Sequence, residues 1–461
     1  AVLLAAADTR GRTPAHVAAE RGHAEVLALL HARRADLAAR DAERRTPLSV
    51  AAEAGAAQSV ERLLEISEDA VAELMRKPGK ELLDCSQGLS PLHFAAASGS
   101  LEVVMQFLAA RAAVQGNGQG DTPLSLAATW RHAAIMDALL EHRAEVNEET
   151  RAGFTPLHNA SVYVDPINSR GSQSIQTLDD EAAILVLLQH GAIVDQKTKD
   201  GRTPTFLAAQ TGRPKALQTL LAARADPSLT SKKSLSPMHA AAENNHCKCM
   251  RILFEARVDI NQLTSSGSSP LKIAASSGWA RASALLLEAL ANPEARGPAA
   301  LSPLHVSVKR GKKEIARKLL DCRASAAART PDGLTPAELA AEAGQEELLA
   351  ELLRHQPRLA SAPGQLLRDL AGLLAACAGP TASPRALPAL EGALGLGVAE
   401  ARDEVAWAAG RHQGEGVRDW DSLLALMMAG LEVLGPRAMA RVVQLVRLRV
   451  PAGCRAGCTE P

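Results

Sequence analysis

Residues 88–100 have the sequence GLSPLHFAAASGS, and close variants of this segment return along most of the chain. They include GRTPAHVAAERGH at 11–23, GFTPLHNA at 153–160 and GLTPAELAAEAGQ at 333–345. Six of the nine intervals between the prolines of this pattern are 33 residues, and one is 32. A fixed period of this size predicts a solenoid, in which each unit buries its apolar face against its neighbours. The ten prolines are Pro14, Pro47, Pro91, Pro123, Pro156, Pro204, Pro237, Pro270, Pro303 and Pro336.

The residues around each proline predict two helices per unit. A Thr or Ser before a proline is a helix N-cap followed by a favoured first residue. Alanine pairs such as Ala95-Ala96 make a thin helix face that lets neighbouring helices approach closely. Seven copies have Gly eight residues after the proline, where it ends the first helix, and paired leucines such as Leu220-Leu221 mark a second helix. Seven copies also have Gly three residues before the proline, which indicates a tight turn.

This unit resembles the ankyrin repeat, whose pattern is G-x-T-P-L-H-x-A-A-x-x-G-H followed by V-V-x-x-L-L-L and G-A-D. The resemblance covers roughly residues 8–358. It implies an all-α ankyrin-repeat solenoid of ten helix-turn-helix repeats, joined by short β-turn or hairpin fingers. We therefore expect a repeat array over 1–358 and a helical C-terminal region over 359–461 that caps the array or begins another domain.

Two repeats are longer than the period allows, with insertions near 67–84 and 165–177. The first contains SEDAVAELMRK at 67–77, a capped stretch that we expect to be helical. The second, with DPINSRGSQSIQT at 165–177, is polar and rich in turn formers, which predicts a loop between the two helices of repeat 5.

The chain departs from the ankyrin pattern after the second helix, where Gly191 alone keeps the glycine of G-A-D. If the position needs a left-handed backbone, each arginine there costs on the order of 1 kcal/mol relative to glycine. One interpretation is compositional drift towards Arg, and the other is a basic ladder that meets an acidic partner. The six arginines are Arg34, Arg111, Arg143, Arg224, Arg257 and Arg323.

Composition narrows the classes of function. The 461 residues carry 51 basic and 51 acidic side chains, whereas a nucleic-acid partner favours a basic excess. No apolar run reaches the ~18–20 residues of a membrane span. Seven scattered cysteines favour a reducing compartment, so we expect an intracellular protein, in the cytoplasm or alternatively the nucleus. Because Ala1 lies in a repeat-like segment, we also expect the chain to be a fragment.

Histidine recurs two residues after five of the prolines. Successive repeats stack at about 8–10 Å, whereas zinc ligands lie ~2 Å from the ion, so these histidines cannot share a metal. We expect them instead to bond to the backbone at the helix start. The five are His16, His93, His158, His239 and His305.

Other chemistry is sparse in the sequence. Two short groups, His246-Cys247-Lys248-Cys249 and Cys454 with Cys458, lack the further ligands of a zinc site. No phosphate-binding loop and no G-x-S-x-G or H-E-x-x-H motif occurs. We therefore predict no catalytic residues, no metal and no cofactor, and no enzymatic activity in this chain.

Aromatic residues supply the candidate binding site. Trp130 and Tyr163 both lie seven residues after their prolines in consecutive repeats, and Phe154 precedes Pro156 by two. The resemblance places the first two at the exposed end of the first helix on the concave side, with Phe154 on a turn over that surface. Exposed aromatic clusters are typical interface anchors. The alternative is that Trp130 and Tyr163 fill space beneath the inserted loop.

The predicted function is non-catalytic binding of a protein partner through the concave ankyrin surface, by a monomeric array. The alternative is the recruiting or regulatory arm of a larger enzyme, channel or ubiquitin-ligase subunit whose catalytic part lies outside this chain. Two weaker alternatives concern the C-terminal region, namely an unrecognised enzyme domain and membrane-surface binding by 437–450.

Overall fold

The computed structural model describes residues 6–75, 89–116, 120–162, 180–297, 301–343 and 345–355. The chain divides into two compact units, Ala1–Val258 and Asp259–Pro461, and each is considered by itself. The predicted C-terminal region, 359–461, and the loop at 165–177 both lie outside the described residues.

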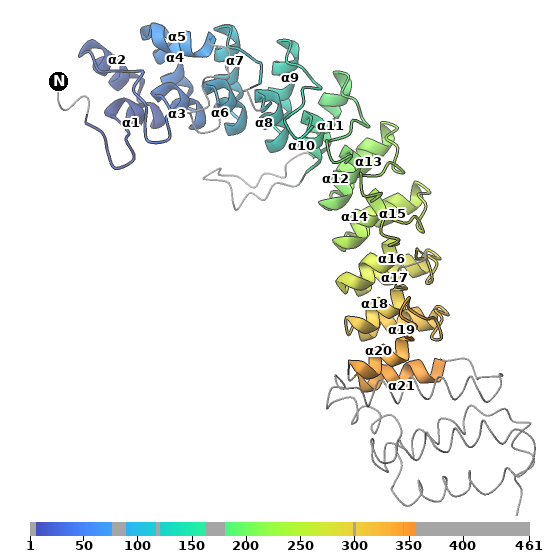
Figure 1. Ribbon diagram of the computed structural model, residues 1–461. Coiled ribbons are helices and arrows are strands. Elements are labelled where there is room, and N and C mark those ends of the chain that lie inside the picture. The colour runs from blue at the N-terminus through green and yellow to red at the C-terminus, as the bar shows by residue number, and fades with distance from the viewer. Residues whose placement is uncertain are drawn as a thin grey trace, which may run out of the picture. The chain divides into compact units, whose positions relative to one another are not determined.

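The ten prolines of the repeat pattern each begin a short helix, so the predicted all-α solenoid of ten repeats is confirmed (Figure 1). These inner helices are α1 (Pro14–Glu20), α3 (Pro47–Glu53), α6 (Pro91–Ser98), α8 (Pro123–Trp130), α10 (Pro156–Ser161), α12 (Pro204–Gln210), α14 (Pro237–Glu243), α16 (Pro270–Ser277), α18 (Pro303–Lys309) and α20 (Pro336–Glu342).

A second, outer helix follows each inner helix, and repeat 2 has one helix more. The outer helices are α2 (Ala24–Ala32), α4 (Ala57–Ile66), α7 (Leu101–Ala109), α9 (Ala133–Glu141), α11 (Asp180–Gln189), α13 (Pro214–Ala222), α15 (Cys247–Glu255), α17 (Ala280–Glu288), α19 (Lys313–Asp321) and α21 (Glu346–His355). The extra helix, α5 (Glu68–Met75), confirms the helix expected in the first insertion, and Ser67 Oγ accepts from the Ala70 amide at 3.2 Å. Among the described residues, no helix has the length and apolar character needed to cross a bilayer.

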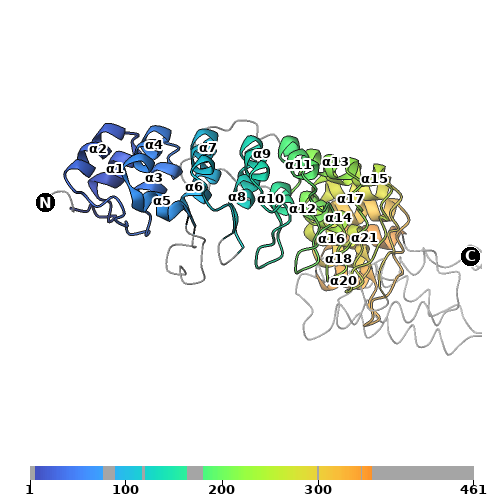
Figure 2. The same cartoon turned by 90° about the horizontal axis from the view of Figure 1, so that it is seen from above.

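Within each unit, inner helices stack on inner helices, and outer helices on outer helices. In the first unit, α6, α8 and α10 form one row and α7, α9 and α11 the other, with the finger loops beyond the inner row (Figure 2). The alanine pairs lie between the helices, as Ala95 and Ala96 show with 0% exposure. Small side chains allow this close packing, and leucines such as Leu139 and Leu220 fill the space between inner and outer helices.

The five repeated histidines are completely buried, and each bonds at the start of its own helix. In repeat 3, His93 Nδ1 accepts from the Ser90 amide at 3.1 Å and lies 2.7 Å from Ser90 Oγ. Its Nε2 lies 3.0 Å from the Asp121 carbonyl in repeat 4. A carbonyl only accepts, so Nε2 carries the proton and donates. The predicted backbone-bonding role is confirmed, and the histidine also joins its repeat to the next.

The same bridge recurs at two other histidines. His16 Nε2 lies 2.9 Å from the Arg45 carbonyl, and His158 Nε2 lies 3.2 Å from the Arg202 carbonyl, each two residues before the next proline. His305 Nε2 instead lies 3.0 Å from the Ala328 carbonyl, eight residues before Pro336. We call this set of contacts the histidine relay: an N-cap hydroxyl, a buried imidazole and a carbonyl of the following repeat. One side chain thus gives a hydrogen-bond partner both to the N-cap amide of its own helix and to a carbonyl of the following repeat.

The six arginines after the outer helices all have the left-handed backbone that their position predicts, with φ between 56° and 66°. Gly191 has φ 84° at this position, and Leu290 takes it in repeat 8 with φ 64°. The Schellman-type turn therefore forms whichever residue is present, because the following amide bonds back into the helix, as Ala225 N does to the Leu220 carbonyl at 3.0 Å.

Two arginines from the neighbouring repeats hydrogen-bond to the residue that follows the inner helix of repeat 5. Helix α10 ends at Ser161, and Val162 is extended, with ψ 142°. Its carbonyl accepts from Arg131 Nη2 at 2.6 Å and from Arg213 Nη1 at 3.0 Å. These side chains come from repeats 4 and 6 and are only 6% and 4% exposed. The arginine pair thus fixes the point at which repeat 5 departs from the repeat pattern.

The histidine relay predicts that stability falls as pH decreases below about 6.5. Burial lowers the pKa of His93, His158 and His305 to about 4 each. Above pH 6.5 the rings are neutral in both states, but between pH 6.5 and 4 only the unfolded chain takes up the protons. Each histidine then removes up to ~1.4 kcal/mol of stability per pH unit. Urea unfolding at pH 7.5, 6 and 5 should show falling midpoints, and a flat profile would contradict the relay.

Replacing a left-handed arginine with glycine should change the stability of the protein in opposite directions at two positions. Arg224→Gly should stabilise the protein by a few tenths to about 1 kcal/mol, because glycine accepts the left-handed backbone without strain. Arg131→Gly removes similar strain, since Arg131 has φ 60°, but it also removes the buried bond to Val162. We expect it to destabilise by about 1–3 kcal/mol. Denaturant titrations measure both changes, and equal stabilisation would show that the Val162 contact contributes little.

Candidate protein-binding surface

The fingers of repeats 5 and 6 are closed turns that precede the inner helices. In repeat 5 the Thr150 amide donates to the Phe154 carbonyl at 2.9 Å, and Thr150 Oγ1 accepts from the Phe154 amide at 3.1 Å. Thr198 closes the finger of repeat 6 in the same way, with Arg202 as its partner. Because both the main chain and a side chain close each turn, the finger holds its residues in fixed positions.

Adjacent fingers are joined through their main chains. The Lys199 amide donates to the Ala152 carbonyl at 3.0 Å, and the Lys232 amide donates to the Asp200 carbonyl at 2.9 Å. This approach requires Gly153, because a Cβ there would lie 2.8 Å from the Lys199 nitrogen. The fingers of repeats 5, 6 and 7 therefore form one continuous edge beside the inner helices.

Two of the three predicted anchor residues lie in the described part of the chain. Trp130 is the last residue of α8 and is half-buried. Phe154 is also half-buried, in the finger of repeat 5. Tyr163 lies outside the described residues, so its place beside Trp130 remains a prediction.

Phe154 turns towards the following repeats. Its ring centroid lies 5.7 Å from that of His158, and the Arg202 guanidinium carbon lies 5.7 Å from the Phe154 ring centroid. The side chain also packs against the buried cluster that contains Phe206 and Leu207. Within the described residues no ring contact joins Phe154 to Trp130. The stacking direction explains this, because His158 likewise reaches forward to a carbonyl of repeat 6.

A second layer of histidines was missed by sequence reasoning. His132 and His246 lie nine residues after their prolines, and each ring packs over the helix-ending glycine of the preceding repeat. Their Nε2 atoms bond to the Ala97 and Gln210 carbonyls at 3.3 and 3.1 Å. Burial lowers the pKa of both rings. The shared offset from the proline was the available signal.

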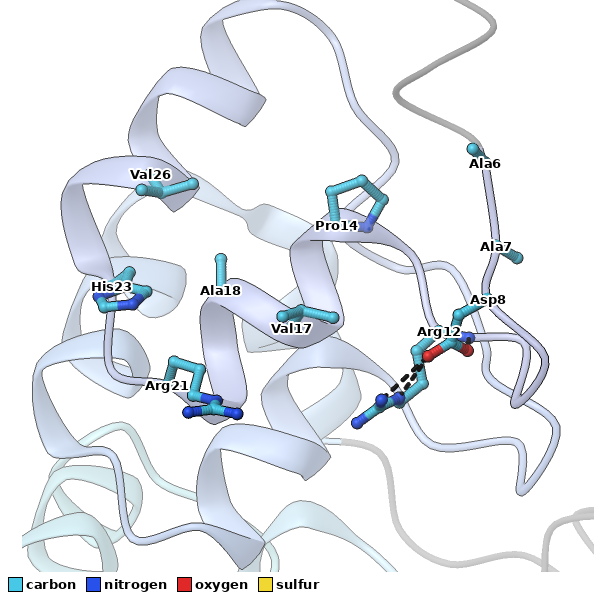
Figure 3. Close-up of a pocket in the computed structure, with 10 residues that line it drawn as sticks. All are labelled: Ala6, Ala7, Asp8, Arg12, Pro14, Val17, Ala18, Arg21, His23 and Val26. Carbon is cyan, nitrogen blue, oxygen red and sulfur yellow. Dashed lines mark hydrogen bonds and ion pairs between the residues drawn. The ribbon is translucent and has the colours of Figure 1, made fainter.

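A cavity of about 670 Å³ opens on α1 and α2 of repeat 1 (Figure 3). Val17 and Val26 line it and are 40% and 43% exposed, whereas Val103, which matches Val26 in repeat 3, is completely buried. Asp8 and Arg12 pair at its rim, with 2.9 Å between Oδ2 and Nη2. The cavity therefore lies on the face of repeat 1 that corresponds to a covered face in repeat 3.

The cysteine group on α15 (Cys247–Glu255) contains one half-buried and one buried thiol. Cys249 is buried, and burial raises the pKa of its thiol to about 11. Cys247 Sγ lies 3.6 Å from Asn245 Oδ1. Within the described ranges, no three His, Cys, Asp or Glu side chains are arranged to hold a metal ion. Cys454 and Cys458 lie outside these ranges.

Comparison with known families gives a match over more than half of the chain. The model described as "Ankyrin repeats (3 copies)" matches residues 2–73, 67–150, 92–168 and 217–297. The single "Ankyrin repeat" model matches residues 200–232.

Curated relatives share single stretches of the array. The Neurogenic locus notch homolog protein 4 of Homo sapiens is 38% identical over 109 residues, which cover 24% of this chain and 5% of the relative. The NF-kappa-B inhibitor delta of Mus musculus is 31% identical over 144 residues, covering 29% of this chain and 44% of the relative. The chain thus spans less than half of the length of these relatives.

A solved structure, the human ASB11 ankyrin repeat domain, matches 51% of this chain and 99% of its own, with 25% identity and a TM-score of 0.43. The family match, the ten proline-started helix pairs and the histidines at the helix starts agree with one another. The chain belongs to the ankyrin repeat family.

Proposed function

We propose that this chain is a non-catalytic scaffold that binds a partner protein through its inner helices and fingers. We call this the inner-helix surface, and it corresponds to the concave side in the ankyrin resemblance. The observation that supports the proposal most is the hydrogen bonding between the fingers of this surface. The finger main chains of repeats 5, 6 and 7 are hydrogen-bonded to one another, so their outward side chains are presented on a rigid edge. Rigid presentation reduces the entropy lost on binding.

Trp130 and Phe154 are the anchors that we propose for this surface, with Tyr163 as the third. Trp130 is half-buried at the end of α8, outside the set of completely buried alanines and leucines. Partly exposed Trp and Tyr side chains often contribute the largest share of binding energy at protein interfaces. Phe154 is held in place by the Arg202 and His158 contacts, so its half-buried ring would lose little conformational entropy on binding.

A second candidate function is that of a recruiting arm in a larger protein. The chain covers only part of each relative, and one of them, the Palmitoyltransferase AKR1 of Lachancea kluyveri, is named as an enzyme. The chain is 29% identical to it over 170 residues, or 21% of its length. A full-length transcript with a catalytic domain would favour this function over that of a free scaffold.

We also propose an intracellular location, in the cytoplasm or nucleus. Cys322 is exposed and not in a disulfide, and Cys247 is a free, half-buried thiol. Exposed thiols persist in a reducing compartment.

The anchors predict that Trp130→Ala combined with Tyr163→Ala weakens partner binding by more than about 2 kcal/mol. Partners would first be identified by proximity labelling with the whole chain, and affinity then measured by calorimetry. If these residues only fill space beneath the insertion, the variant should melt at a lower temperature but bind as before, once the folded fraction is corrected for.

A matched control is Trp279→Ala, which removes an exposed tryptophan from the second unit. It should leave the affinity unchanged if repeats 4 and 5 carry the interface. Equal losses at Trp130 and Trp279 would remove the assignment to repeats 4 and 5.

A further inference from the structure

Three cations occupy one position in three consecutive fingers. Arg151, Lys199 and Lys232 each lie five residues before the proline of their repeat, in repeats 5, 6 and 7. All three side chains are exposed. We call these three residues the cation row.

The row is fixed by the main-chain bonds between fingers. The amides of Lys199 and Lys232 are themselves the donors, at 3.0 and 2.9 Å, to carbonyls of the preceding finger. Packed repeats advance by about 10 Å, so the row presents one positive charge at about this interval. The geometry is set by the backbone and not by flexible side-chain contacts.

The carboxylates nearest the row in sequence bond to other side chains. The Asp200 carboxylate pairs with Arg202 at 2.9 Å, and Glu149 Oε1 accepts from Gln196 Nε2 at 2.6 Å. In the described part of the chain, no acidic side chain lies within ion-pair distance of Arg151, Lys199 or Lys232. The arginines two residues before the proline differ from the row, because Arg12 pairs with Glu20, Arg45 with Asp41 and Arg202 with Asp200.

We propose that the cation row binds an extended acidic segment of a partner protein, which deepens the proposed function and rests on it. A segment in the extended polyproline II conformation has three residues per turn and advances ~3.1 Å per residue, so carboxylates three residues apart lie on one face and recur at about 9 Å. Glu or Asp at positions i, i+3 and i+6 would then meet Arg151, Lys199 and Lys232 in turn. The chain has equal numbers of acidic and basic residues, and three separate charges favour a patterned acidic peptide over a nucleic acid.

The test uses the whole chain and a fluorescein-labelled peptide made of three Glu-Ser-Thr repeats. Fluorescence anisotropy should show saturable binding that weakens as salt rises through about 0.1 M, where the screening length is ~10 Å. The same peptide with Gln in place of Glu should not bind. Saturable binding of the Gln peptide, or none of the Glu peptide, would overturn the proposal.

Variants locate the binding site. Lys199→Glu with Lys232→Glu should raise the Kd for the Glu peptide by about tenfold or more, because like charges then face each other. A peptide of three Lys-Ser-Thr repeats should bind this variant better than it binds the unaltered chain. The matched control is Arg143→Glu with Arg224→Glu, which reverses two exposed charges of the same unit after the outer helices. Equal losses in both variants would reduce the effect to net charge and overturn the proposal.

Two further outcomes would each overturn the cation row proposal in a distinguishable way. Tighter binding of an oligothymidylate than of the Glu peptide, with the same sensitivity to the Lys199 and Lys232 changes, would assign the row to nucleic acid and contradict the proposal. If the Glu peptide fails to bind while a captured partner still depends on Trp130, the cation row proposal falls and the scaffold function stands. Melting curves of each variant confirm that the compared proteins are folded.

Discussion

The buried imidazole at the helix start is the contact that both caps a helix and joins its repeat to the next one in repeats 1, 3 and 5. His93 satisfies the Ser90 amide at its own N-cap and donates to the Asp121 carbonyl of the next repeat. One neutral ring thus satisfies one backbone amide and one backbone carbonyl. Each of these groups would otherwise be buried without a partner, at a cost of ~1–3 kcal/mol. The ring must be neutral to accept at Nδ1, and its burial keeps it so. Local capping and interrepeat stacking are therefore one structural requirement.

The fingers extend this principle to the surface that we assign to binding. Thr150 and Thr198 close their turns with a backbone bond and a hydroxyl bond, and the next finger docks on the outer side. A rigid scaffold leaves the outward residues free to vary, so we propose that partner choice resides in side chains such as Trp130 and the cation row and not in the fold. The arginine pair on the Val162 carbonyl preserves this edge where repeat 5 breaks the pattern.

Much of the fold follows from the sequence because the period fixes each residue by its offset from a proline. The helix starts and the bonding of the histidines at those starts were predicted, and the left-handed backbone of the arginines was considered as a condition, because each depends on local backbone geometry. The orientation of Phe154 and the meeting of Arg131 with Arg213 were not predicted, since they depend on how one repeat is placed on another. The main-chain hydrogen bonds of Lys199 and Lys232 were not predicted either. Contact between fingers leaves no local sequence pattern beyond the recurrent glycine.

The relay is tested most directly by native-state hydrogen exchange on the His93→Gln variant. A glutamine at the third helical position can still reach back to the N-cap amide, but it cannot also bridge to Asp121. If the imidazole couples neighbouring repeats, amides of both repeat 3 and repeat 4 should exchange faster, with α8 affected as well as α6. Faster exchange confined to α6 would contradict the account, because the histidine would then serve only as a local cap.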